Sequence, residues 1–146
     1  MNATARLRWP AASRLKAPAQ FEAVAAAGRD EGFRAARRWL ALSSRWQAAA
    51  SGGVRFGFTV GKRNARRAVD RATVKRILRE ACRHARGELE EASAGRAVDV
   101  VLRLKSPLPE RDALPRAELK RALRAEADAL LAELRLRIAQ LPPLSA

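Results

Sequence analysis

The spacing of apolar residues predicts β-strands at two places in the chain. Residues 54–60 and 98–104 alternate between apolar and other side chains, which is the two-residue period of a strand with one buried face. A short apolar run at residues 39–42 favours a further strand. The residues predicted to face the core from the two alternating strands are Val54, Phe56, Phe58, Val60, Val98, Val100, Leu102 and Leu104.

Three other segments carry apolar residues at helical spacing. Pro18 suits the first turn of a short helix that Gly28 ends. A second helix is predicted over residues 69–86, and a third over residues 119–138, before a pair of prolines. Residues 106–115 contain three prolines and are expected to form a loop. The middle of the chain is therefore predicted to run strand, helix, strand.

The polar and basic segment 28–38 predicts no element of its own. The strand at 54–60 has small residues, Gly57 and Thr59, on its second face. They leave space for a ligand against the sheet, and equally for a helix that packs closely. The pattern favours neither interpretation.

Composition narrows the class of protein. A chain of 146 residues that is 48% apolar can form one domain with one core. A single cysteine (Cys82) and a single histidine (His84) exclude a disulfide-stapled fold and a zinc finger. No apolar run is long enough to span a bilayer, and residues 1–19 lack the apolar stretch of a secretory signal. We expect a soluble protein in a reducing compartment.

The charge predicts an anionic partner. Lys and Arg total 30 against 15 Asp and Glu, a formal net charge of +15. On a helical wheel, the cations of the predicted helix 69–86 cover less than half the circumference, beside a separate apolar side. Like charges four residues apart cost a few tenths of a kcal/mol per pair, which a polyanion would offset. We therefore favour a nucleic-acid-binding face over a merely solvated one. The six cations are Arg71, Lys75, Arg76, Arg79, Arg83 and Arg86.

Signs of catalysis are lacking. The acids that could hold a catalytic metal, Asp70, Glu80 and Asp99, are scattered along the chain. Cys82 is interpreted as a small buried residue and His84 as an ordinary polar neighbour. Phe21 is a candidate platform for an RNA base, although its spacing fits a core position at least as well.

The segment RFGFTVGKRNARRA (residues 55–68), followed by Arg71 and KRILRE (residues 75–80), resembles the protein component of bacterial ribonuclease P. The resemblance extends loosely over residues 15–138. It implies an α+β fold, an α/β sandwich of order α-β-β-α-β-β-α with a central four-stranded sheet. It also implies a left-handed β-α-β crossover, which is a rare hand, and a short strand within residues 103–114.

In this family the RNA subunit hydrolyses precursor tRNA with divalent metal, and the protein binds the RNA subunit and the single-stranded 5′ leader. The resemblance implies ribonuclease P RNA and precursor tRNA as partners, one protein per RNA subunit, Mg²⁺ as the cofactor of the holoenzyme, a cytoplasmic location, and no catalytic residue in this chain. It assigns Phe21, Gly57 and Thr59 to the leader cleft. It assigns RNA binding to Lys62, Arg63, Asn64, Arg66, Arg67, Arg71, Lys75, Arg76, Arg79 and Arg83.

The chain is expected to divide into a basic N-terminal arm (1–14), one domain (15–141) and a short tail (142–146). It departs from the family pattern at Ala72-Thr73, where Asn-Arg is usual, and at Ala25, where a second aromatic is usual. The alternatives are a general or ribosome-associated RNA-binding protein and, third, a helix-turn-helix DNA-binding protein. The third is disfavoured because the basic helix lies between two predicted strands.

Overall fold

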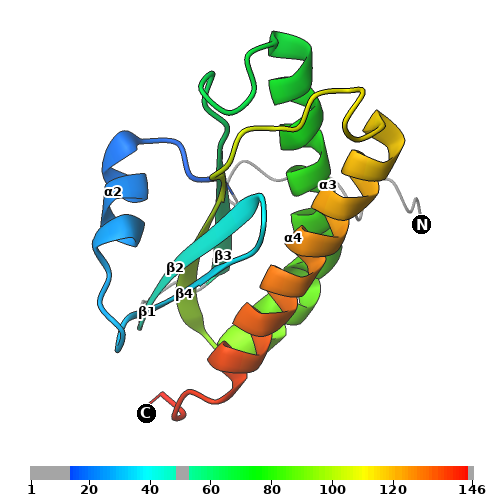
Figure 1. Ribbon diagram of the computed structural model, residues 1–146. Helices are drawn as coiled ribbons and strands as arrows, with labels where there is room; N and C mark the ends of the chain where they lie inside the picture. The colour runs from blue at the N-terminus through cyan, green and yellow to red at the C-terminus, as the bar shows by residue number, and fades with distance from the viewer. Residues whose placement is uncertain (1–13, 49–52, 145–146) are drawn as a thin grey trace, which may run out of the picture.

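A mixed four-stranded sheet is the centre of the computed structural model, which describes residues 14–48 and 53–144 (Figure 1). Its spatial order is β1-β2-β4-β3. β1 pairs antiparallel with β2 and β2 antiparallel with β4, whereas β3 pairs parallel with β4. The strands are β1 (Gly32–Ala36), β2 (Leu40–Ala48), β3 (Gly53–Thr59) and β4 (Arg96–Leu104).

Helices cover both faces of the sheet. α3 (Ala68–Ser93) and α4 (Arg116–Ala139) lie side by side on one face, and the short α2 (Pro18–Ala26) lies on the other (Figure 1). The α+β sandwich with a four-stranded sheet is therefore confirmed. In the described part of the chain, no helix is both long enough and apolar enough to cross a membrane.

The strand register places the predicted apolar residues on the face beneath α3 and α4. Phe56 pairs with Val100, and Val100 in turn pairs with Ser44 of β2, so that one row of buried side chains crosses three strands. Leu78 of α3 and Leu130 of α4 are fully buried in the same core. Phe58 is partly buried, and the other seven predicted core positions are buried.

The expected order of elements is wrong, and so is the expectation that segment 28–38 forms no element of its own. The observed order is α-β-β-β-α-β-α, because the fourth strand precedes the basic helix instead of following it. That strand is β1, in the segment where no element was predicted. β1 is an edge strand in which Phe33 and Ala35 face the core side, while the intervening Arg34 donates to the carbonyls of Ala25 and Ala27 at the end of α2. The charged Arg34 therefore reflects an edge position rather than a loop.

The short strand expected within residues 103–114 does not form after Leu104. Residues 105–115 are a loop held by single hydrogen bonds, from Lys105 N to Trp39 O (2.8 Å) and from Leu108 N to Asn64 O (2.9 Å). Prolines in this loop lack the N–H that a ladder needs.

The predicted helices and strands differ from the observed ones mainly in length. β2 continues to Ala48, and α3 continues past Arg86 to Ser93. The expected N-terminal arm lies outside the described residues except for Arg14, and residues 145–146 of the expected tail lie outside them too.

Cys82 is fully buried between α3 and α4, as the sequence indicated, and burial raises the pKa of its thiol well above the usual range. Because the thiolate is the reactive form, we predict that Cys82 in the folded protein does not react with a thiol reagent such as DTNB at pH 8. One equivalent should react after unfolding in guanidinium chloride. Rapid reaction without denaturant would contradict the burial of Cys82.

Candidate nucleic-acid interface

α3 separates a buried side from a cationic side, as its sequence predicted. Val74, Leu78 and Ala81 lie in the core, whereas Lys75 and Arg76 are exposed and Arg79 is half-buried. This arrangement places the cations of α3 beside the outer edge of β3, the last strand of the sheet.

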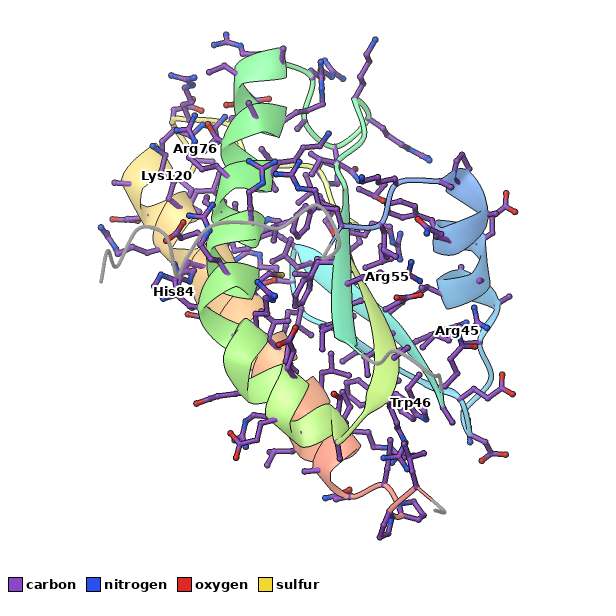
Figure 2. All side chains as sticks on the ribbon, turned by 180° about the vertical axis from the view of Figure 1, so that it is seen from behind. Arg45, Trp46, Arg55, Arg76, His84 and Lys120 are labelled. Carbon is purple, nitrogen blue, oxygen red and sulfur yellow. The ribbon has the colours of Figure 1, made fainter. Side chains whose placement is uncertain are left out.

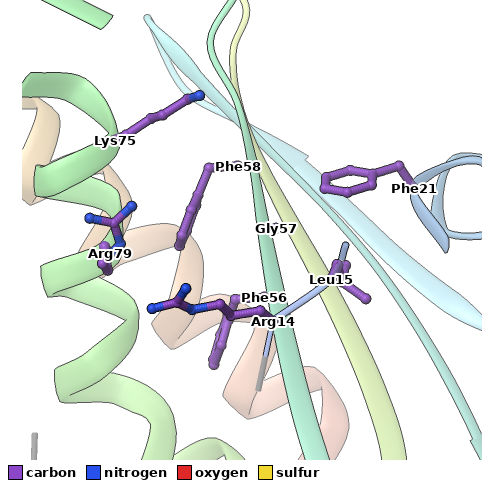
Figure 3. A pocket seen from close by; sticks show the side chains of 8 residues that line it. All are labelled: Arg14, Leu15, Phe21, Phe56, Gly57, Phe58, Lys75 and Arg79. Carbon is purple, nitrogen blue, oxygen red and sulfur yellow. The ribbon is translucent and has the colours of Figure 1, made fainter. Parts of the chain in front are cut away.

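A hollow of about 190 Å³ lies at this edge (Figure 3). Figure 3 shows Lys75 and Arg79 approaching it from α3 and the Phe21 ring approaching it from α2. Cationic and aromatic side chains therefore meet at one place. The hollow is lined by Arg14, Leu15, Phe21, Phe56, Gly57, Phe58, Lys75 and Arg79.

Gly57 is required for the position of Phe21. A Cβ atom at residue 57 would lie 2.5 Å from two carbons of the Phe21 ring and 3.2 Å from Leu15 Cβ. The space over Gly57 is therefore filled by an aromatic residue of a closely packed helix. Thr59, two residues along β3, is exposed and does not line the hollow. The ring of Phe21 is only partly buried, so part of it remains open to solvent.

The same sheet face carries an ion pair that sequence reasoning did not single out. Asp99 is 7% exposed, and its two carboxylate oxygens accept from Arg55 Nε and Nη2, each at 2.8 Å. The hydrogen bond with Asp99 raises the pKa of Arg55. The strand register is the signal that could have revealed this ion pair, since residues 55 and 99 are paired across β3 and β4.

The loop before α3 contains residues with two different roles. Lys62, Arg63, Arg66 and Arg67 are exposed, as expected for cations that contact RNA. Asn64, in contrast, uses its side-chain amide to donate to the carbonyl of Leu104 at 2.9 Å.

Arg71 also holds this loop. Its Nη1 donates to the carbonyls of Ala65 and Arg66, both at 2.9 Å. The side chains of Asn64 and Arg71 therefore fix the basic loop against β4 and α3. No signal in the sequence distinguished them from the free cations, because their partners are backbone carbonyls.

α3 also carries pairs of opposite charge, which offset part of the repulsion between its cations. Arg83 Nη1 lies 3.0 Å from Glu80, and Arg86 Nε lies 3.2 Å from Glu90. These acids lie three or four residues from the cations, which brings them within reach on a helix. Arg83 is thus partly committed to Glu80.

The departures from the family pattern at Ala72 and Thr73 offer no donor to RNA from either side chain. Ala72 is exposed and has no polar group, and the Thr73 hydroxyl donates to the Val69 carbonyl at 2.8 Å. The cations on either side, Arg71 and Lys75, are the nearest in sequence.

The three acids that the sequence offered as metal ligands face cations. Asp70 faces Arg116 at 3.4 Å, Glu80 faces Arg83, and Asp99 is held by Arg55. Within residues 14–48 and 53–144, no three His, Cys, Asp or Glu residues are grouped as metal ligands.

Comparison with known proteins identifies the family. The family model described as Ribonuclease P matches residues 9–125. The ribonuclease P protein component of Bordetella avium (strain 197N) is 40% identical over 121 residues, which cover 82% of this chain and 89% of that protein. The ribonuclease P protein component of Bordetella petrii is 37% identical over 135 residues, which cover 89% of this chain and 98% of that protein.

Solved structures share the fold. The Staphylococcus aureus RNase P protein matches with a TM-score of 0.58 at 20% identity, over 88% of this chain and 95% of that chain. The Thermotoga maritima RNase P protein in complex with 1-(4-fluorophenyl)-2-thiourea matches with a TM-score of 0.51 at 16% identity, over 88% of this chain and all of that chain. Family model, relatives and fold agree, and the chain belongs to the family of ribonuclease P protein components.

Proposed function

We propose that this chain binds the RNA subunit of ribonuclease P through the cationic side of α3 and the loop before it. We propose further that it binds the single-stranded 5′ leader of precursor tRNA at the hollow beside β3. The observation that carries this proposal is the convergence of Lys75, Arg79 and the partly open Phe21 ring on that one hollow. The protein would thereby assist removal of the leader.

The two kinds of side chain would contribute differently. Arginine and lysine neutralise and position phosphates, which gives affinity and register but little sequence information. An aromatic ring stacks on any base. A site that combines them suits an enzyme that must accept many different leaders. Gly57 would contribute by allowing Phe21 to lie close to β3.

The hydrolysis itself would belong to the RNA subunit. Mg²⁺ would be the cofactor of the holoenzyme and would be held by RNA, because the three acids that the sequence offered as metal ligands, Asp70, Glu80 and Asp99, face cations of this chain. The residues of this chain would hold the substrate strand and the RNA subunit in register.

We propose the remaining features of the assembly from the resemblance to the family. One copy of the protein would serve one RNA subunit in the cytoplasm, where precursor tRNA is its substrate. Residues 15–141 would form the RNA-binding domain, with the basic segment 1–14 as an additional arm. General RNA binding would be the competing function, and stimulation of precursor tRNA cleavage by a cognate ribonuclease P RNA separates the two.

Removing two cations from α3 should impair precursor tRNA processing. We predict that Arg76→Ala/Arg79→Ala lowers single-turnover cleavage by a cognate ribonuclease P RNA at low Mg²⁺, with little change at high Mg²⁺, where added cations screen the phosphates. The log-log salt dependence of RNA affinity should become shallower by about 1.4 to 1.8 for the two lost contacts.

A matched control removes the same charge elsewhere. Arg29 and Arg121 are both exposed and lie outside α3, so Arg29→Ala/Arg121→Ala should retain near-normal cleavage. If the unmodified protein binds many RNAs but fails to stimulate cleavage with its cognate RNA, the general RNA-binding function replaces the proposed one.

The Phe21 ring should be required for binding of the 5′ leader and not for binding of the rest of the tRNA. Loss of one stacked base costs about 1–3 kcal/mol, so Phe21→Leu should weaken holoenzyme binding of leader-bearing precursor tRNA by about 5- to 150-fold. Binding of mature tRNA, which lacks the leader, should be unchanged. Equal losses for both tRNAs would show that Phe21 serves the fold and not the leader.

A further inference from the structure

A second hollow, of about 580 Å³, lies between the loop before α3 and the loop before α4. One wall comes from residues 63–67 and the other from residues 107–112, with Asp70 and Arg116 from the first turns of the two helices. The second wall lies outside the basic motif of the sequence. The arginines that line the hollow are Arg63, Arg66, Arg67, Arg111 and Arg116.

The guanidinium groups outnumber the acids that line the same space. The acids are Asp70, Glu110 and Asp112, so five positive charges face three negative ones. Glu110 and Asp112 are exposed, whereas the Asp70 side chain is only 14% exposed. Asp70 is therefore the one acid shielded within the hollow.

The ion pairs of Asp70 are loose. Its carboxylate lies 3.4 Å from Arg116 and 4.0 Å from Arg111, beyond the roughly 2.7–2.9 Å of a strong charge-assisted hydrogen bond. The 4.0 Å pair of Asp70 with Arg111 contributes little, because Arg111 is 56% exposed, so Arg111 can leave the pair at low cost.

One hydrogen-bond donor of Arg116 has no acceptor in the described part of the chain. Its Nη1 donates to the Pro109 carbonyl at 3.2 Å, and its Nη2 faces Asp70. Its Nε atom is shielded from solvent and has no hydrogen-bond partner in the part of the chain that the structure describes. A buried N–H without an acceptor is costly, and a rotation of the Arg116 side chain toward the hollow would let an anion oxygen accept from it.

We propose that this hollow binds a phosphate group, held between Arg111 and Arg116 on one wall and the arginines of residues 63–67 on the other. The planar fork of arginine matches phosphate oxygens in pairs. The phosphate would come from the backbone of the RNA subunit or from a small free phosphate compound, and only the first source rests on the proposed function.

Pyrophosphate is the probe that tests the site without RNA. The full-length protein, labelled with ¹⁵N, is titrated with pyrophosphate while the arginine Nε–H signals are followed by NMR. The Arg116 signal should shift and saturate, and Arg111→Gln should weaken the affinity by about tenfold, which is the loss of one charged hydrogen bond. Arg111→Gln should not disturb the fold, because the Arg111 side chain is 56% exposed.

Arg121→Gln is the matched control, because Arg121 is an exposed cation of α4 that does not line the hollow. It should leave pyrophosphate binding unchanged. A linear shift of Arg116 without saturation, or equal effects of Arg111→Gln and Arg121→Gln, would overturn the proposal.

A second arm identifies the source of the phosphate. If the site holds an RNA phosphate, Arg111→Gln should make the salt dependence of binding to ribonuclease P RNA shallower by about 0.7 to 0.9. If pyrophosphate saturates the site while this slope is unchanged, the site binds a small phosphate compound. The NMR titration contains no RNA. Its result therefore tests the phosphate site even if the proposed function in ribonuclease P is wrong.

Discussion

The parallel pairing of β3 with β4 is the constraint on which the rest of the structure depends. Two parallel neighbours need a long crossover, and here α3 is that crossover. α3 must bury one side against the sheet and α4, and this leaves its cationic side at the outer edge of β3. Phe21 reaches the same edge from α2 on the opposite face, because Gly57 has no side chain to block it. One topological requirement thus brings cationic side chains and the Phe21 ring to one hollow. Figure 2 shows Arg76 on α3 and Arg55 on the neighbouring strand β3.

Some basic or polar residues of the motif are held by hydrogen bonds within the protein. Arg71 and Asn64 hold the loop before α3 by donating to backbone carbonyls, and Arg55 is held by Asp99. These contacts fix the backbone from which the exposed cations project. Some cations therefore organise the loop and the sheet, and the exposed ones are those that we propose bind RNA.

The sequence predicted those parts of the fold in which one face is buried. The strands at 54–60 and 98–104 and the two sides of α3 could be found because alternation and helical spacing report burial directly. β1 was missed because this short edge strand has only two apolar side chains on its core side above the size of glycine, Phe33 and Ala35, with Arg34 between them on its open face. The role of Gly57 stayed undecided because it depends on Phe21, a contact between residues far apart in the chain. The structural roles of Asn64 and Arg71 have no sequence signature, since backbone carbonyls are their partners. The left hand of the crossover and the RNA contacts of individual residues stay predictions.

The central claim is that the cationic side of α3 faces the RNA subunit, and site-specific crosslinking tests it most directly. A single photoreactive group is attached to a cysteine that replaces either Ala72 or Ala125. Ala72 is exposed among the cations of α3, and Ala125 is exposed on α4. Buried Cys82 should remain unlabelled, and the unmodified protein controls for this. The account predicts crosslinks to ribonuclease P RNA from Ala72→Cys and few from Ala125→Cys. Efficient crosslinking from Ala125→Cys with none from Ala72→Cys would contradict it.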